Sequence, residues 1–187
     1  MPPERASILI DGSNFYFKLR DLNLHQLLTF NFSQFAISLI GKRPLVQASY
    51  YVGAVRTDGT AKTQQLFNHQ RQLFAHLRKH KYTYSLGYLL KDRKGVFHEK
   101  GVDVNIAVDL LVASYEHLCE RLYLVSSDTD LIPAIAKAQE KGTTVIYVAF
   151  SHQVSKALVA ACKETQTLTK ETLVPFLQPQ EQTIEHL

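Results

Sequence analysis

The sequence predicts an α/β fold with a mainly parallel central sheet and helices on both faces. Short apolar runs alternate along the chain with segments whose apolar residues recur at helical spacing. Two acidic motifs directly follow such runs, Asp11 after residues 6–10 and Asp128 after residues 122–126. A chain of 187 residues with 45% hydrophobic and 20% charged residues suits a single domain of this class.

The N-terminal third contains two predicted strands and two predicted helices. Residues 6–10 read as a strand, and a helix is expected to start near Ser13 or Asn14, which are good N-cap residues, and to end near position 22. A second helix is predicted over 33–40, and the glycine that follows it is a helix stop signal. Residues 46–55 are rich in aromatic and β-branched side chains and predict a long strand.

The middle of the chain predicts a helix and a hairpin. Leucine and phenylalanine recur near helical spacing over 61–79, which indicates an amphipathic helix. A strand is expected over 82–90, and the polar turn 91–95 is expected to fold back through 96–98. The alternating Tyr82, Tyr84 and Tyr88 could stack on bases, but packing within the sheet is the favoured interpretation.

The C-terminal half continues the alternation. A helix over 103–116 is expected to be largely buried, because two apolar sides leave little polar surface. One side is a stripe of Val104, Ala107, Val108, Leu111 and Tyr115, and the other is Ile106 and Leu110. The remaining predicted elements are a strand over 122–126, a helix over 131–141, a strand over 144–149, a helix over 153–162 and a short strand over 165–168. Residues 1–177 are expected to form one domain, with a flexible tail over 178–187.

The positive charge of the chain is concentrated in one segment. Residues 62–100 carry nine Lys or Arg against two acids, a net charge of +7 within a total of +4. Such an excess favours a polyanionic partner, although a solvated helix face and loop would look the same. The predicted nucleic-acid contacts are Arg71, Arg78, Lys79, Lys91, Arg93, Lys94 and Lys100.

Three acidic motifs predict a metal site. If strands 6–10 and 122–126 are neighbours, Asp11 and Asp128 project from adjacent carboxyl ends, with Asp130 beside them and Asp103 supplied by the entrance of a helix. Clustered carboxylates repel one another unless a cation compensates, and Mg²⁺ or Mn²⁺ prefers such oxygen ligands. A divalent ion there would support phosphodiester hydrolysis.

Each acid also has a structural interpretation. Asp11 could belong only to a strand-to-helix turn, and Asp103, Asp128 and Asp130 could simply cap helices. Independent caps, however, need not fall at one edge of one sheet. The supporting residues are predicted to be Asn14, which could orient a carboxylate or water, and Ser127 or Thr129 as hydrogen-bond donors, whereas Asp109 is expected to be solvated or supporting.

These motifs together resemble a known family. Ile8-Leu-Ile-Asp-Gly-Ser-Asn14, Lys100-Gly-Val-Asp-Val104 with Asp109, and Val125-Ser-Ser-Asp-Thr-Asp-Leu-Ile-Pro133 are similar to the NYN domain of the PIN-like superfamily, and most of all to its LabA-like bacterial branch. The resemblance implies a three-layer Rossmann-like PIN fold, an acidic pocket for Mg²⁺ or Mn²⁺ and ribonuclease activity. Carried over by motif, the acidic set is Asp11, Asp103, Asp128 and Asp130, supported by Asn14.

The resulting hypothesis is a metal-dependent endoribonuclease. Its main rival is a non-cleaving RNA-binding or regulatory module that keeps the fold. A haloacid-dehalogenase-type phosphatase is disfavoured because only 57 residues follow Asp130, and a dinucleotide-binding role because no Gly-x-Gly-x-x-Gly follows the first strand. Without an apolar leader or membrane-length run, a cytoplasmic location is expected, with Cys119 and Cys162 as buried thiols. The choice between RNA and DNA and the formation of a homodimer stay open.

Overall fold

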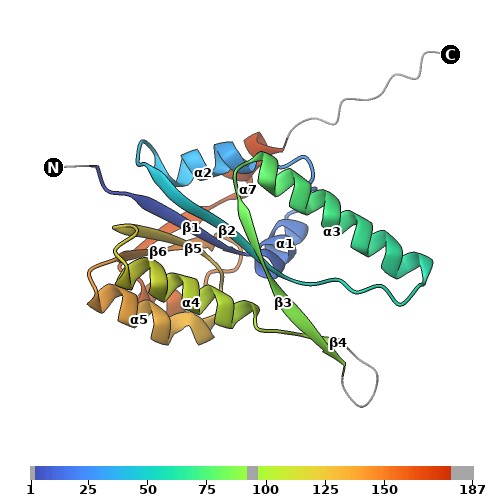
Figure 1. The fold of residues 1–187 in the computed structure, drawn as a ribbon. Coiled ribbons are helices and arrows are strands. Elements are labelled where there is room, and N and C mark those ends of the chain that lie inside the picture. Colours follow the sequence, from blue (N-terminus) through green and yellow to red (C-terminus); the bar gives the residue numbers. More distant parts are fainter. Residues whose placement is uncertain (1–2, 92–96, 178–187) are drawn as a thin grey trace.

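The computed structural model describes residues 3–91 and 97–177, and within them it contains one seven-stranded sheet. The strand order is β4-β3-β2-β1-β5-β6-β7 (Figure 1). All pairings are parallel except that of β3 with β4, which forms the predicted hairpin. The strands are β1 (Ala6–Asp11), β2 (Leu45–Gly53), β3 (Thr83–Lys91), β4 (Phe97–Lys100), β5 (Arg121–Val125), β6 (Thr144–Phe150) and β7 (Glu164–Leu168).

Helices cover both faces of the sheet, so the predicted three-layer α/β architecture is confirmed. Buried residues of α1 (Gly12–Asp21), α2 (Phe32–Ile40), α3 (Ala61–Lys79) and α7 (Lys170–Leu173) share one core. A second core on the opposite face is shared by α4 (Val102–Tyr115), α5 (Ile132–Glu140) and α6 (Lys156–Ala161). Two 3₁₀ turns complete the fold, η1 (Thr129–Leu131) and η2 (Val174–Phe176). No helix within the described residues is long and apolar enough to span a membrane.

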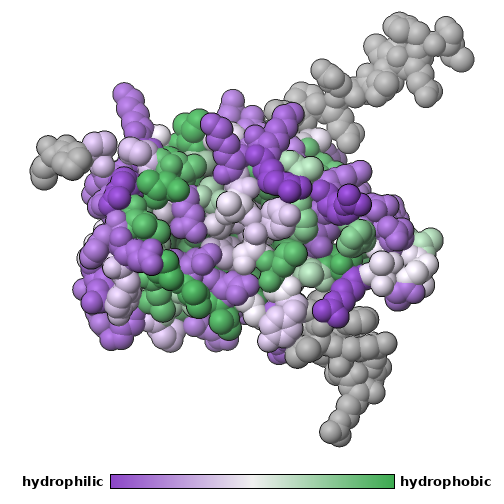
Figure 2. All heavy atoms as spheres, viewed as in Figure 1, coloured by the Kyte–Doolittle hydropathy of each residue, from purple (hydrophilic) through white to green (hydrophobic). Residues whose placement is uncertain are grey.

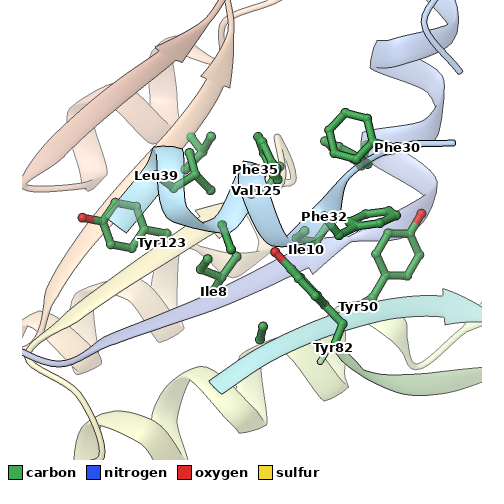
Figure 3. Packing of buried hydrophobic residues seen from close by; sticks show 14 of the residues in the cluster. Ile8, Ile10, Phe30, Phe32, Phe35, Leu39, Tyr50, Tyr82, Tyr123 and Val125 are labelled. Carbon is green, nitrogen blue, oxygen red and sulfur yellow. The ribbon is translucent and has the colours of Figure 1, made fainter. Parts of the chain in front are cut away.

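The first core is built around aromatic side chains. The Phe15 ring lies within 5.5–6.3 Å of the rings of Phe30, Phe32 and Phe35, centroid to centroid, in edge-on or tilted contacts. Figure 3 shows Phe30, Phe32 and Phe35 of this group above Ile8 and Ile10 of β1. Edge-on aromatic pairs add favourable electrostatics to area burial, so this cluster fixes α1 and α2 against the strand that carries Asp11.

Helix α4 is less buried than its sequence predicts. Ile106 and Leu110 are fully buried, but Val104 is 64% exposed, Val108 50% and Tyr115 51%. The prediction that this apolar stripe is buried is therefore wrong. Only the side of α4 that carries Ile106 and Leu110 faces the sheet, whereas hydrophobic residues remain visible on the outer surface over α4 (Figure 2).

The C-terminal end contains structure that the sequence pattern did not reveal. Thr169 caps α7 in a reciprocal capping box with Thr172, and η2 follows directly. The Phe176 ring of η2 lies 5.9 Å from the Phe30 ring and 5.6 Å from the Phe35 ring. A four-residue helix has too few residues to show a periodic pattern, which explains why it was missed. Most of the predicted turn 91–95 and all of the tail 178–187 lie outside the described residues.

Two histidines of α3, His76 and His80, lie between helices. His76 Nε2 is 2.8 Å from the Phe30 carbonyl oxygen, and His80 Nδ1 is 2.8 Å from the Ser33 hydroxyl. The Ser33 backbone N–H also donates to His80 Nδ1 at 3.3 Å. These contacts attach the C-terminal end of α3 to the start of α2. The side chain of His98 lies outside the described residues, and both cysteines are buried as expected.

We expect His80 to make stability depend on pH. Burial, followed by the nearby His76 and Lys79, lowers the pKa of His80 below its ordinary value of 6.5. Because the folded pKa is the lower one, the unfolded chain binds more protons in that window, and folding stability falls as pH drops below about 6.5. The midpoint of urea denaturation should fall between pH 8 and pH 5, and it should fall less steeply with pH in His80→Gln than in the parent.

The matched control is His69→Gln, which changes an exposed histidine of the same helix and should keep the slope of the parent. Equal slopes in the parent and His80→Gln would contradict the assignment of this pH dependence to His80.

Candidate active site at the carboxyl edge of the sheet

Asp11 is the last residue of β1 and the N-cap of α1. Its carboxylate Oδ1 accepts a hydrogen bond from the Asn14 backbone N–H at 3.0 Å, and the residue is only 6% exposed. The N-cap is therefore Asp11, two or three residues before the predicted caps Ser13 and Asn14. Asp11 has the structural role of a cap and, at the same time, lies where a parallel sheet binds ligands.

The first strand and the strand before Asp128 are neighbours, which is the condition on which the predicted meeting of Asp11 and Asp128 depends. β1 pairs with β5 in parallel, with Ile10 opposite Val125. Ser126, the residue after β5, donates its hydroxyl hydrogen to Asp11 Oδ2 at 2.9 Å, and its oxygen accepts the Asp128 backbone N–H at 3.1 Å. One buried serine thus connects the two acidic motifs.

Asp128 and Asp130 form a local turn at the same edge. Asp128 is the N-cap of η1, and its Oδ1 accepts the Asp130 backbone N–H at 2.8 Å. Asp128 is half-buried, whereas Asp130 is exposed to solvent. Capping by Asp128 agrees with the structural interpretation of this motif and leaves Asp130 facing outward.

Asp103 belongs to a different element, the helix α4. Gly101, with a positive φ of 84°, turns the chain from β4 into α4 and is the N-cap of that helix. Asp103 is exposed in the first helical turn and is not the cap, so that interpretation is wrong. Helix α4 contacts both β1 and η1, the elements that carry Asp11 and Asp130.

Asp109 of α4 pairs with a tyrosine of β2, and its predicted supporting role stays a prediction. Its Oδ2 accepts the Tyr51 hydroxyl at 2.6 Å, and Tyr51 lies opposite Asp11 in the pairing of β1 with β2. Burial, followed by this hydrogen bond to Asp109, raises the pKa of Tyr51. The pair joins α4 to the strand beside Asp11, and thereby fixes the helix that carries Asp103.

We define the acidic edge as Asp11, Asp103, Asp128 and Asp130. Within the described part of the chain, no group of three or more His, Cys, Asp or Glu side chains is arranged so that it could hold a metal ion. The assignment of these four acids as metal ligands therefore stays a prediction. The Asn14 contact with Asp11 described above runs through the backbone, and a role for its side-chain amide stays a prediction too.

Two residues that make contacts around the acidic motifs, Ser126 and Tyr147, were not predicted from the sequence. Ser127 was expected to support the acids, but its neighbour Ser126 makes the contact with Asp11. Ser127 Oγ is 3.4 Å from the Tyr147 hydroxyl, which accepts the Ser155 backbone N–H at 3.1 Å. Tyr147 therefore links the loop after β5 to the loop after β6. Side-chain alternation could have identified Ser126, because it follows the buried Leu122 and Leu124 at a spacing of two.

The predicted basic residues are spread over α3 and the hairpin. Arg71, Arg78 and Lys79 are exposed on α3, and Lys100 is exposed at the end of β4. Arg93, Lys94 and the side chain of Lys91 lie outside the described residues. Helix α3 precedes β3 in the chain, and β4 precedes α4. These cations therefore lie on or next to strands of the sheet whose edge carries the acids.

Comparison with known proteins decides the family. The family model described as NYN domain matches residues 5–169, nearly the whole described chain. The chain belongs to the NYN domain family. NYN domains are members of the PIN-like nuclease superfamily, whose enzymes typically depend on divalent metal ions, whereas the LabA-like branch stays a prediction.

Solved structures support the fold. A crystal structure of a protein of unknown function from Vibrio parahaemolyticus is similar to this NYN domain, with a TM-score of 0.65 and 22% sequence identity over 89% of this chain and 93% of that chain. At this level of identity the likeness concerns the fold alone. No curated protein matches the chain.

Proposed function

We propose that this NYN domain is a metal-dependent endoribonuclease that hydrolyses phosphodiester bonds at the acidic edge. The observation that carries the proposal is the Ser126 hydroxyl, which joins Asp11 of β1 to the backbone of Asp128 after β5. Two acidic motifs separated by more than a hundred residues meet there, within a family of nucleases. The substrate is assigned as RNA from the activity that the family resemblance implies.

The donor chemistry of the acidic edge suits Mg²⁺ or Mn²⁺. Mg²⁺ usually binds through one or two carboxylates and completes its shell with waters and substrate phosphate oxygens. Asp11 and Asp128 supply carboxylate oxygens at one edge, so a three-residue cluster of protein ligands is not required. A bound ion would polarise a phosphoryl oxygen and acidify a water molecule.

The side chains of the chain itself have separate roles in this proposal. Asp11 is held by Asn14 N–H and Ser126 Oγ, so its carboxylate keeps a fixed orientation. The exposed Asp130 orients the attacking water, and Asp103 completes the acidic set from α4. Lys100, exposed just before that helix, contacts the substrate phosphate. Attack of water on phosphorus breaks one P–O bond and leaves a phosphomonoester and a free hydroxyl.

The second candidate is a non-cleaving RNA-binding module. It is favoured by one observation, namely that no three-ligand group for a metal occurs among the described residues. Such a module would bind RNA through its basic surface without using the acidic edge.

Chelation separates the two candidates. Incubated with a 5′-fluorescein-labelled single-stranded RNA of about 20 nucleotides, the parent protein should cleave in Mn²⁺ or Mg²⁺, stop in excess EDTA and resume when the ion is restored. Denaturing gel electrophoresis measures the products. RNA that stays intact under all three conditions while it still binds would establish the non-cleaving module, and cleavage that continues in EDTA would exclude metal dependence.

A further inference from the structure

A hollow of about 540 Å³ lies between α3 and β3. We call it the α3 hollow. Its helical side carries two arginines and two amides, Asn68, Arg71, Gln72 and Arg78, and its floor is formed by Phe74 and Tyr84. Together with Ala75, the arginines and amides follow the helical i, i+3, i+4, i+7 pattern at positions 68, 71, 72, 75 and 78, so they lie on one face of α3. Hydrophilic residues crowd the surface over this helix in Figure 2.

The charge of the α3 hollow is not balanced within its own helix. Residues 61–79 contain four Lys or Arg and no Asp or Glu. Among residues 3–91 and 97–177, neither Arg71 nor Arg78 forms an ion pair with a carboxylate. Guanidinium groups pair with phosphate through parallel N–H donors, and the amides of Asn68 and Gln72 add neutral donors. The lining therefore suits an anion with several oxygens.

The floor adds a feature typical of nucleic-acid sites. The rings of Phe74 and Tyr84 are stacked, with centroids 4.0 Å apart and planes 7° apart. The Arg78 guanidinium lies 5.7 Å from the centroid of the Tyr84 ring. Phe74 is buried, so the half-buried Tyr84 ring supplies the aromatic surface beside these cations. Aromatic surface beside cations is typical of single-stranded nucleic-acid sites, whereas an acidic peptide offers no bases to it. This combination favours RNA over an acidic protein.

The α3 hollow lies close to the acidic edge across the sheet. Asp11 pairs with Tyr51, and Tyr51 pairs with Ser85, the residue after Tyr84. Two strand spacings correspond to about 10 Å between the backbones of β1 and β3. Tyr84 packs on the α3 side, whereas Ser85 is contacted by Asn105 of α4, so the hollow and Asp103 lie on opposite faces of the sheet.

We propose that the α3 hollow binds backbone phosphates of single-stranded RNA that flank the cleaved bond, through Arg71 and Arg78. The inference rests on the proposed RNA substrate of the acidic edge. In this proposal α3 binds the RNA strand, and the carboxylates of the acidic edge catalyse hydrolysis.

The test measures binding without cleavage. Fluorescence anisotropy of a labelled 20-nucleotide single-stranded RNA in EDTA should show that Arg71→Gln/Arg78→Gln binds at least about tenfold more weakly than the parent in dilute salt. Two lost phosphate contacts should also reduce the slope of log K against log salt by about 1.4, because each single-strand contact contributes about 0.7. Equal affinity and slope in the parent and the double variant would overturn the proposal.

A matched variant controls for net charge. Lys42→Gln/Lys163→Gln removes two exposed cations that do not line the hollow, and it should change affinity by less than about threefold. A decrease as large as that of the arginine variant would overturn the proposal, because net charge alone would explain the binding. Displacement of the RNA by a polyglutamate peptide of equal charge would also overturn the proposal, because it would indicate an acidic protein partner. The proposal would fail as well if the parent protein had no affinity for the RNA.

The outcomes also separate this inference from the proposed nuclease. Arginine-dependent binding by a protein that never cleaves RNA would support the α3 hollow and refute hydrolysis at the acidic edge. Metal-dependent cleavage by a protein whose RNA affinity does not depend on Arg71 and Arg78 would support hydrolysis at the acidic edge and refute the α3 hollow.

Discussion

Asp11→Asn is expected to reduce RNA cleavage by roughly 100- to 1,000-fold while the protein stays folded. The substitution removes a negative charge from a side chain that is only 6% exposed. Asparagine is as good an N-cap as aspartate, so its oxygen can still accept the Asn14 N–H and keep α1 in place. Its NH₂ group would then face Ser126 Oγ, which can accept a hydrogen bond in place of donating one. The loss should therefore concern ion binding and chemistry.

The measurements are initial rates on labelled RNA in Mn²⁺ and Mn²⁺ binding by calorimetry. Asp128→Asn should behave similarly, because Asp128 lies in the same hydrogen-bonded loop. Asp21→Asn is the matched control, since this exposed acid at the far end of α1 contacts only the Gln153 amide among described residues. If Asp11→Asn and Asp128→Asn both cleave as fast as the parent, the activity does not come from the acidic edge.

Gly12→Ala is expected to destabilise the protein by about 3 kcal/mol. A Cβ atom at this position would lie 2.7 Å from the Tyr51 carbonyl oxygen and 2.7 Å from Cζ of the Tyr50 ring. Neither group can move easily. The Tyr50 hydroxyl donates to the Gly12 carbonyl at 3.2 Å, and its ring contacts Phe32 in the aromatic core. The tight approach of α1 to β2 therefore requires glycine directly after Asp11.

Urea denaturation followed by circular dichroism measures this effect. Gly59→Ala is the control, because a Cβ there meets no atom within 4 Å and only the positive φ of 88° opposes it. That backbone strain costs about 1–2 kcal/mol. A Gly12→Ala protein as stable as Gly59→Ala or more stable would show that the β1 to α1 turn has more room than the structure indicates.

Much of this architecture could be predicted because it depends on local patterns. The helix over 61–79 was predicted with its observed bounds, since its ends are marked by local signals such as the cap at Thr60. The first strand and the strand before Asp128 were predicted within one residue of their observed ends. Their adjacency was an assumption of the sequence argument, and the structure shows that the two strands pair in parallel, with Asp11 and Asp128 at one edge.

The partners of individual side chains could not be predicted in the same way. The contact of Ser126 with Asp11 and the pairing of Tyr51 with Asp109 join residues separated by 115 and 58 positions. The α4 stripe that contains Val104 is apolar but exposed, because periodicity identifies a face without saying what covers it. The positions of His76 and His80 against α2 likewise depend on how two helices dock.

The sequence by itself determined the alternation of strands and helices and the order of the acidic motifs, because each depends on near neighbours and on the alternating burial of strands. Only the tertiary structure decided that Ser126 connects Asp11 to the Asp128 loop and that Arg71, Arg78 and Tyr84 line one hollow. The physical reason is that hydrogen bonds and cavities arise where distant segments pack, and the register and docking of those segments are collective results of the whole core.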